Sequence, residues 1–533
     1  MNCTSFRIPY RQANAFSHIA LDYIDHAETL QPFYSFAPSL AGIQQQIEQR
    51  KNVETDRNVL VNVLNEQYQN VSTKDVVSNN IKKLIETNCF TVTTAHQPNL
   101  LTGPLYFIYK ILHAIKLAEH LQQSFPDYSF VPVYYMGSED ADFDELGHFY
   151  LDGEKKEWKS KQTGAFGRMK TDKELIKIIE TLDGQLSIFP HGKEIIQLIK
   201  DFFKEGETIQ QATFQLINAL FGQYGLIVLI ADHPALKEQM NSIFKDDLLN
   251  QLSSNIVQET SAKLDENYKI QANPREINLF YMADEIRSRI EWANDHYIVH
   301  GTKLKFSKDE LLHELETHPE RFSPNVILRA VFQETILPNI AFIGGGGELA
   351  YWLQLKDLFN HYKVPFPVLV LRNSFLIIEE KWKKKIQKLK IETDDIFLPA
   401  DEIINKKVTE DSKNELSLNG TYQQANNLYE SLMQQAGSID KSLITHVERL
   451  KTQQLEKLKE LEKKMLRAEK RKFSDQRRQV ENIKNRLFPK NGLQERYDNI
   501  LFYYAVYGSE LLDKLYDHSL ALEQEFTVLE INN

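Results

Sequence analysis

Short and almost entirely apolar runs, each joined to segments with helical spacing, recur through the first 376 residues. The runs occupy 90–95, 130–136, 225–231, 336–343 and 367–371. A run of this length without polar alternation is typical of a strand that is buried on both faces. Strands that alternate with helices form a parallel, doubly wound sheet. The sequence therefore predicts an α/β core built on five parallel strands.

The spacing of the strands and the sequence that follows them predict the domain organisation. Two long gaps, near 151–220 and 235–320, are expected to be connecting insertions into the sheet. Beyond the last strand, glycine and proline become rare. Apolar residues then recur at steps of three or four between Lys, Arg and Glu, which is typical of a coiled-coil helix over about 440–487. We expect a core at 1–376 and a C-terminal α-helical coiled-coil domain at 377–533.

Composition narrows the class of protein further. The 533-residue chain has a formal net charge of −11, and an acidic surface disfavours non-specific binding to nucleic acid. Its two cysteines, Cys3 and Cys89, are too few for a cysteine-based zinc site and fit a reducing compartment. We find no secretory signal and no run of about 18 apolar residues. The expectation is a cytoplasmic protein without a nucleic-acid or membrane partner.

The first candidate site follows the strand at 90–95. His96, Gln97 and Asn99 lie in the turn between this strand and a helix expected to begin at Pro104. The free amide groups and the positive dipole end of such a helix favour an anion. The three side chains are therefore candidates for contacts to a phosphate or a carboxylate. The alternative is that Asn99 only caps the turn.

An acidic loop, Ser138 to Glu145, follows the second strand and places five carboxylates within seven residues. Such carboxylates repel each other unless a cation, an amine or hydrogen-bond donors offset their charge. Glu139, Asp140 and Asp142 are therefore candidate catalytic residues, and Ser138 is a candidate substrate contact. The carboxylates are expected to deprotonate an amine or to hold Mg²⁺, with Asp140 and Asp142 as the candidate ligands. The alternative is a solvated loop in which Asp140 or Asp142 caps a helix.

Four consecutive glycines, at 344–347, follow the fourth strand and allow the backbone to approach a ligand closely. The run is not a Walker A loop, because no Gly-Lys-Ser/Thr follows it. The carboxylate of Glu348 would repel a phosphate, so we expect an amine-bearing substrate beside it. The alternatives are that the start of the following helix accepts a carboxylate instead, or that the run is only a flexible turn. The candidate substrate-binding residues of this segment are Gly345, Gly346, Glu348, Tyr351 and Gln354.

Two arginine-containing segments complete the expected site. One contains Asn325 and Arg329, and the other is Arg372-Asn373-Ser374, directly after the fifth strand. The forked guanidinium group of arginine suits a carboxylate or a phosphate, although structural ion pairs are an equal alternative. Ligands bind at the carboxyl ends of parallel strands, so we expect the polar loops to meet in one cleft.

These motifs together resemble the bacillithiol biosynthesis cysteine-adding enzyme family (BshC). The resemblance spans nearly the whole chain, with the motifs in the same order. The similar stretches lie at 95–110, 131–143, 322–329, 333–338, 344–356, 372–374 and 487–496. Members often have Gly-Gln-Gln where this chain has Ala95-His96-Gln97, and His where it has Ala141, so roles that rest on these positions stay open.

The resemblance implies a Rossmann-like core with connecting insertions and a coiled-coil domain that helps to form a homodimer. It implies that L-cysteine is added to the amine of glucosaminyl-malate to give bacillithiol. Amide formation requires an activated acid, so ATP and Mg²⁺ are the expected co-reactants. His96 would stabilise phosphate charge, and Asp140 or a neighbouring carboxylate would hold Mg²⁺ or take the proton of the amine. Arg329 or Arg372 would hold a carboxylate, such as that of malate.

Two other classes of function also fit these patterns. A non-enzymatic coiled-coil scaffold would keep only a degenerate nucleotide-binding core, but polar loops at three strand ends argue against it. The second class is another ATP-dependent amino-acid ligase, including one similar to aminoacyl-tRNA synthetases. Such an enzyme would also activate an amino-acid carboxyl group with ATP but would transfer it to a different acceptor. The acidic net charge argues against tRNA, although 463–478 is locally basic.

Overall fold

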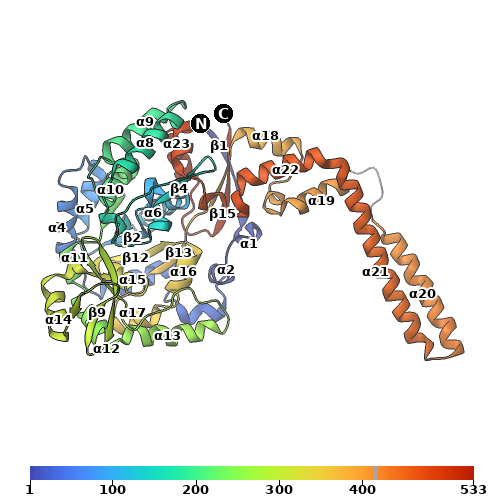
Figure 1. The fold of residues 1–533 in the computed structure, drawn as a ribbon, viewed down its shortest axis with the longest axis horizontal. Helices are drawn as coiled ribbons and strands as arrows, with labels where there is room; N and C mark the ends of the chain where they lie inside the picture. The colour runs from blue at the N-terminus through green and yellow to red at the C-terminus, as the bar shows by residue number, and fades with distance from the viewer. Residues whose placement is uncertain (412–416, 533) are drawn as a thin grey trace. The chain divides into compact units, whose positions relative to one another are not determined.

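The five apolar runs form one parallel sheet in the computed structural model, which describes residues 1–411 and 417–532. The strand order is β13-β12-β2-β3-β6, and Figure 1 labels β2, β12 and β13 of this sheet. All five predicted strands are confirmed, but the fourth begins three residues late because the preceding helix extends to Ile336. The strands are β2 (Cys89–His96), β3 (Ser129–Met136), β6 (Ile227–Ile230), β12 (Asn339–Gly344) and β13 (Val368–Leu371).

Helices cover this sheet and bury its apolar side chains. Ile47 of α3 and Leu117 of α6 belong to one core cluster with Val92 and Ile343 of the sheet. The helix expected from Pro104 begins at Tyr106, after a short 3₁₀ turn at Leu100–Thr102. The helices that matter for the sites below are α3 (Leu40–Lys51), α6 (Tyr106–Ser124), α7 (Phe143–Leu146), α15 (Val326–Ile336), α16 (Gly346–Trp352) and α17 (Lys356–Tyr362).

Both long gaps are folded insertions. The first contains β4 (His148–Leu151), β5 (Glu154–Glu157), α8 (Lys173–Leu186), α9 (Gly192–Phe202) and α10 (Ile209–Phe221). The second contains α11 (Pro234–Glu238), α12 (Asn241–Asn250), α13 (Leu252–Asp265), β7 (Leu279–Ala283), β8 (Ile286–Ala293), β9 (His296–Val299), β10 (Lys305–Phe306) and α14 (Lys308–Thr317). With β11 (Phe322–Pro324), its strands form an antiparallel sheet in the order β10-β9-β8-β7-β11.

The two chain ends meet in a third sheet, in the order β1-β15-β14. β1 (Asn2–Pro9) pairs with β15 (Glu525–Asn532) through eight antiparallel positions (Figure 1). β14 (Phe375–Ile378) lies on the other side of β15. Two helices, α23 (Ile500–Tyr507) and α24 (Glu510–Asp517), precede β15.

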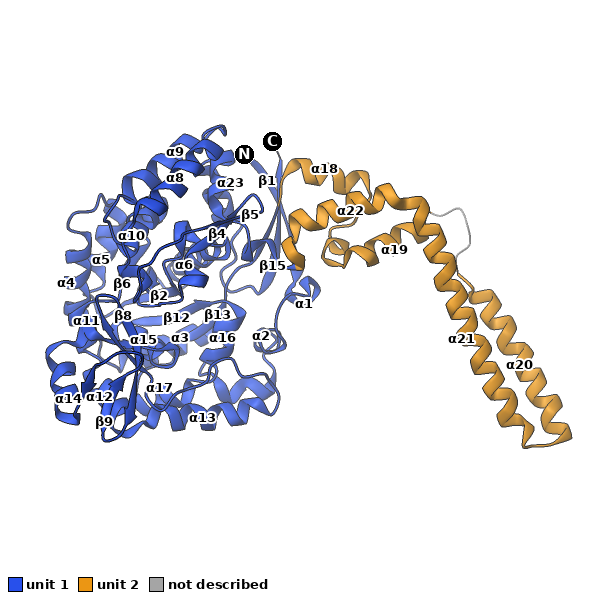
Figure 2. Cartoon of the chain, in the orientation of Figure 1, with its two compact units in different colours: residues 1–377, 492–533 blue, residues 378–491 orange. Residues whose placement is uncertain are grey.

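The chain divides into two units that differ from the predicted domains at one end. Unit 1 comprises residues 1–377 and 492–533, and unit 2 comprises 378–491 (Figure 2). The predicted helical domain ran from 377 to 533 and so included the last segment, which the division into compact units assigns to unit 1. That segment returns to unit 1 because β15 forms its ladder with β1.

Unit 2 is helical and contains an antiparallel hairpin of α20 (Asn419–Ile439) and α21 (Leu443–Lys470) (Figure 1). The helix expected over 440–487 is interrupted at Arg471–Phe473, and α22 (Ser474–Leu487) follows. The other helices of this unit are α18 (Glu380–Lys388) and α19 (Ala400–Asp411). Within 1–411 and 417–532, no helix is both long enough and apolar enough to cross a membrane.

Candidate functional site

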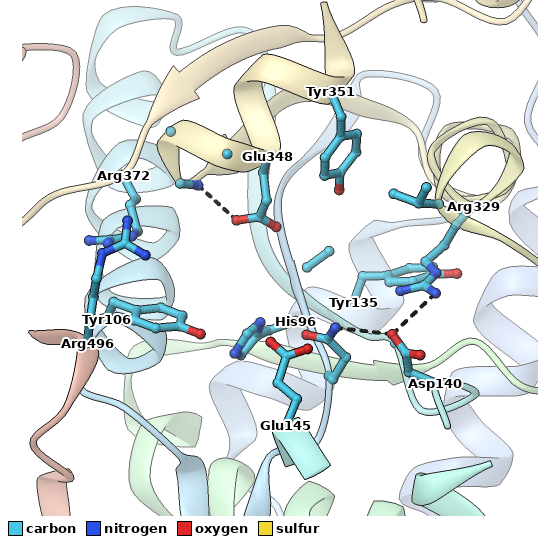
Figure 3. A pocket seen from close by; sticks show the side chains of 17 residues that line it. His96, Tyr106, Tyr135, Asp140, Glu145, Arg329, Glu348, Tyr351, Arg372 and Arg496 are labelled. Carbon is cyan, nitrogen blue, oxygen red and sulfur yellow. Dashed lines mark hydrogen bonds and ion pairs between the residues drawn. The ribbon is translucent and has the colours of Figure 1, made fainter. Parts of the chain in front are cut away.

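A cavity of about 330 Å³ lies at the carboxyl ends of β2, β3, β12 and β13, where an open parallel sheet binds ligands (Figure 3). All of its lining residues belong to unit 1. The structure thus brings together most of the loops singled out from the sequence. The predicted site residues that line the cavity are His96, Gln97, Asp140, Arg329, Gly345, Gly346, Glu348, Tyr351 and Arg372.

Asp140 stands in a positively charged corner of the cavity (Figure 3). Its carboxylate lies 3.6 Å from the Arg329 guanidinium and 3.7 Å from that of Arg287, and it accepts a 3.1 Å hydrogen bond from Gln97 Nε2. Burial alone would raise the pKa of Asp140, but the two arginines and Gln97 hold that pKa below its usual value. Asp140 is therefore ionised at neutral pH and orients the guanidinium of Arg329.

His96 is the last residue of β2 and lies on the cavity floor, with its ring against Tyr106 and Phe107. Burial, followed by the charges of Lys110 and Arg372, lowers the pKa of His96 well below its ordinary value. Its buried Nε2 has no hydrogen-bond partner among the described residues. A neutral imidazole with one unused ring nitrogen can hydrogen-bond to a ligand but does not supply a full positive charge.

Glu348 already holds an ammonium group, which is that of Lys110. Lys110 Nζ lies 2.9 Å and 2.7 Å from the two Glu348 carboxylate oxygens and also donates to the Ala95 carbonyl. Glu348 in turn accepts a 2.8 Å hydrogen bond from the Gly345 amide, which fixes the glycine turn at the start of α16. The amine that we expected Glu348 to bind is thus supplied by the protein itself, so its carboxylate positions the loop.

The opposite side of the cavity contains two further arginines, Arg372 and Arg496 (Figure 3). Arg372 Nη2 donates a 2.6 Å bond to Glu495, and Nη1 donates to the hydroxyl group of Ser374 and the carbonyl oxygen of Asn373, at 3.0 Å each. The guanidinium group of Arg496 has no hydrogen bond or ion pair among the described residues, and only its backbone amide is bonded, to the Leu493 carbonyl. Arg496 is therefore the cavity cation that remains available to an anionic ligand.

Glu145, at the end of the acidic loop, also lines the cavity (Figure 3). Within the described part of the chain its carboxylate forms no hydrogen bond or ion pair. Partial burial, and then the charges of Asp142 and Asp140, raise the pKa of Glu145. A carboxylate with a raised pKa and free oxygens is suited to accept a proton from an amine.

The other members of the acidic loop do not reach the cavity. Glu139 is buried and forms an ion pair with Lys237, which also lies 3.2 Å from Asp232. Asp142 caps α7, since its Oδ1 accepts a 3.0 Å bond from the Glu145 amide. Ser138 is buried, with no hydrogen-bond partner for its hydroxyl group among the described residues. Glu139 and Asp142 thus have structural contacts instead of the expected access to substrate.

Five more expected substrate contacts also lie outside the cavity. Asn99 is buried against Gly103, which has a φ of +61° and no room for a side chain there. Asn325 caps α15 and donates to Asn278. The remaining three support neighbouring backbone or side chains: Gln354 bonds to Ala272, Asn373 Nδ2 to the carbonyl of Leu520, and Ser374 to Arg372 and Glu495.

The surroundings of Asp140 and Asp142 do not fit a magnesium ion held between them. Arg287 and Arg329 flank Asp140, and the Asp142 carboxylate is used as a helix cap. Over 1–411 and 417–532, no cluster of three or more His, Cys, Asp or Glu side chains is arranged to hold a metal. An ion with oxygen ligands requires carboxylates that are free of competing cations.

Three functional candidates were missed by the reasoning from sequence. Lys110 stands among apolar residues of α6, and a charge in such a stripe signals a buried partner. Glu145 belongs to the acidic loop but was not selected within it. Arg496 follows the coiled-coil region, and only the return of the chain to unit 1 brings it to the cavity.

Comparisons with known proteins match the chain along almost its whole length. Residues 1–373 match the model described as "Bacillithiol biosynthesis BshC, N-terminal Rossmann-like domain", and 375–531 match the corresponding C-terminal coiled-coil domain. Proteins named "Putative cysteine ligase BshC" from Flavobacterium psychrophilum and Flavobacterium johnsoniae are 40% and 39% identical to it. Each alignment covers 98% of this chain and 99% of the relative. A protein of the same name from Christiangramia forsetii is 38% identical over 99% of this chain and 98% of its own.

Proposed function

Because the chain belongs to the bacillithiol biosynthesis BshC family, we propose that it is a ligase that joins the carboxyl group of L-cysteine to the amine of glucosaminyl-malate, giving bacillithiol. The observation that carries the proposal is the convergence of nine predicted residues on one cavity at the carboxyl edge of the sheet. This cavity presents both a free cation, Arg496, and a free carboxylate, Glu145. Coupling an acid to an amine requires contacts of both kinds.

Each free group has a role in this proposal. Arg496 binds an anionic group, such as a malate carboxylate or a phosphate, and Arg372 beside it adds positive potential. Glu145 accepts the proton that the glucosamine amine loses as it attacks the activated carboxyl carbon. The unused Nε2 of His96 hydrogen-bonds to an oxygen of the activated group.

The expected co-substrate is ATP, which supplies the activation of the cysteine carboxyl group, since a carboxylate oxygen is a poor leaving group. Arginines at both ends of the cavity and the neutral His96 suit its phosphates. Mg²⁺ would enter with the nucleotide, because Asp140 and Asp142 do not form a site for it. ATP and a free thiol substrate are both cytoplasmic metabolites, and the proposal places the protein there.

The proposal is tested by reconstitution with purified protein. Cysteine, glucosaminyl-malate, ATP and Mg²⁺ are combined, each is omitted in turn, and the thiol product is measured by mass spectrometry. We expect bacillithiol only in the complete mixture. Product with serine or alanine but not with cysteine would indicate another amino-acid ligase, and no product from any mixture would favour the scaffold.

Glu145→Gln gives the sharper test of mechanism. Removing a general base typically lowers the rate about 10²- to 10⁴-fold. The fall should appear in kcat with little change in the KM for glucosaminyl-malate, and the rise of kcat with pH should disappear. Asp144→Asn is the matched control, because Asp144 is an exposed neighbour that does not line the cavity. Equal activity of both variants would remove Glu145 from the mechanism.

We also propose that the chain forms a homodimer through the α20–α21 hairpin. Several large apolar side chains of the hairpin are exposed, although such residues are normally covered in a stable protein. A second hairpin offers a matching apolar surface. The exposed residues are Leu428, Leu432, Ile439, Leu443, Ile444, Leu450 and Leu461.

A further inference from the structure

A second cavity, of about 460 Å³, lies at the amino edge of the parallel sheet, opposite the candidate active site. The last turns of α3, α15 and α17 form part of its wall, and only two residues separate the end of α15 from the start of β12. None of the residues assigned a role in ligation lines it. It is therefore a separate space whose contents need their own explanation.

Glu334, on the last turn of α15, is fully buried in this wall. Its Oε1 accepts hydrogen bonds of 2.8 Å from Gln333 Nε2 and 2.9 Å from Asn339 Nδ2. Its Oε2 has no partner among the described residues. A buried carboxylate oxygen without a donor costs free energy that a bound donor would recover.

Arg50, at the end of α3, contributes an opposite charge to the same wall. It is 3% exposed, and its Nη2 donates to the carbonyl of Leu337 at 2.7 Å and to the hydroxyl of Thr55. Its Nε is buried without an acceptor, and among the described residues no ion pair joins Arg50 to Glu334. A buried Nε2 of Gln239 is a second unused donor in this wall.

Because one buried, unused acceptor and two buried, unused donors belong to residues of one cavity wall, we propose that this cavity binds a small zwitterion of the α-amino-acid class. The ammonium group of the ligand donates to Glu334, and its carboxylate accepts from Arg50 Nε and Gln239 Nε2. A simple cation would leave the two donors unsatisfied, and a simple anion would leave Glu334 unsatisfied. The partial negative charge at the ends of three helices further favours the ammonium group near Glu334.

The test is isothermal titration calorimetry of the full chain at about pH 8.5, above the raised pKa of Glu334, so that its carboxylate is ionised. Three small probes isolate each charge: glycine, methylamine and acetate. We expect glycine to bind at least about tenfold more tightly than either singly charged probe. Glu334→Gln keeps the shape but removes the negative charge and should weaken glycine at least about tenfold. Glu54→Gln is the matched control, since Glu54 is an exposed residue of the same cavity. The affinity of this variant for glycine should stay within about twofold of wild type.

Ser242→Trp provides a second variant if Glu334→Gln folds poorly. Ser242 is exposed and lines the cavity, so a large ring at this position should block access to it. It too should abolish glycine binding. Glycine affinity that persists in both variants overturns the proposal, since it would then arise elsewhere, including at the amino-acid subsite of the ligase cavity. An absence of glycine binding at millimolar concentration, or equal binding of methylamine or acetate, also overturns it. The outcome is independent of whether the ligase reaction is observed.

Discussion

The Lys110–Glu348 pair gives a direct test of how the candidate active site is held together. The side chain of Lys110 is 1% exposed and that of Glu348 is 27% exposed, and their closest contact is 2.7 Å. Lys110→Met leaves Glu348 in a low-dielectric cavity with only the Gly345 amide as a donor. Removing one partner of a fully buried pair costs about 3–5 kcal/mol. Because Glu348 is partly exposed, we expect the lower end of this range, a loss of about 3 kcal/mol in the free energy of unfolding.

The loss should be much smaller when both charges are removed together. In Lys110→Met/Glu348→Gln, no uncompensated charge remains, so the double variant should be about 2 kcal/mol more stable than the sum of the single effects predicts. Urea unfolding followed by tryptophan fluorescence suits this measurement, because Trp158, Trp292 and Trp352 belong to unit 1.

The exposed Lys177–Glu174 pair is the matched control. Its closest contact is also 2.7 Å, but its side chains are 66% and 55% exposed. Lys177→Met should therefore leave the unfolding midpoint essentially unchanged, because solvent screens such pairs. The reasoning is refuted if Lys110→Met is no more destabilising than Lys177→Met, or if the effects of the two substitutions at the buried pair simply add.

Three further predictions concern other parts of the chain. Burial raises the pKa of Glu334 to about 7, so between pH 4.5 and 7 the folded state binds more protons than the unfolded state, and this group's contribution to stability falls as pH rises. The stability of Glu334→Gln relative to wild type should therefore increase by up to about 3 kcal/mol over that range in urea titrations, and a flat difference would contradict this. Asn499→Ala removes the donor to the carbonyls of Leu101 and Gly103 and should cost about 1–3 kcal/mol of unfolding free energy by the same assay. Leu428→Glu with Leu450→Glu should convert a dimer into a monomer in sedimentation velocity, whereas an unchanged sedimentation coefficient would exclude this hairpin surface as the interface.

The sheet could be predicted because each strand carries its own signal. Strands such as β3 are buried on both faces, so their sequences are continuously apolar. β1 has no such signal, since all of its residues except Ile8 are partly or fully exposed, and its partner, β15, lies more than 500 positions away. The pairing of the two chain ends, and with it the return of 492–533 to unit 1, could not be read from local periodicity. The interruption at Arg471–Phe473 was also missed, because neither glycine nor proline marks it.

The position of the candidate site could be predicted from the sequence, but the contacts that each of its side chains makes could not. Loops that follow parallel strands converge by topology, which is why His96, Asp140 and Arg372 line one cavity. Whether a polar side chain in such a loop faces the ligand or the protein depends on contacts from distant segments. Glu139 turns to Lys237, for example, and that ion pair has no signature in the sequence around either residue.

The distinction between paired and free charges suggests how this cavity discriminates among ligands. Asp140 lies against Arg329, and Arg372 is paired with Glu495, so these groups form a fixed electrostatic frame that needs little reorganisation when a ligand binds. A substrate that displaced one partner would leave the other charge uncompensated, which is costly in a buried site. Direct recognition should therefore fall to the groups without partners, Arg496 and Glu145. In the proposed function Arg496 binds an anion and Glu145 accepts a proton from an amine, so their joint loss should abolish turnover while the paired charges keep the cavity intact.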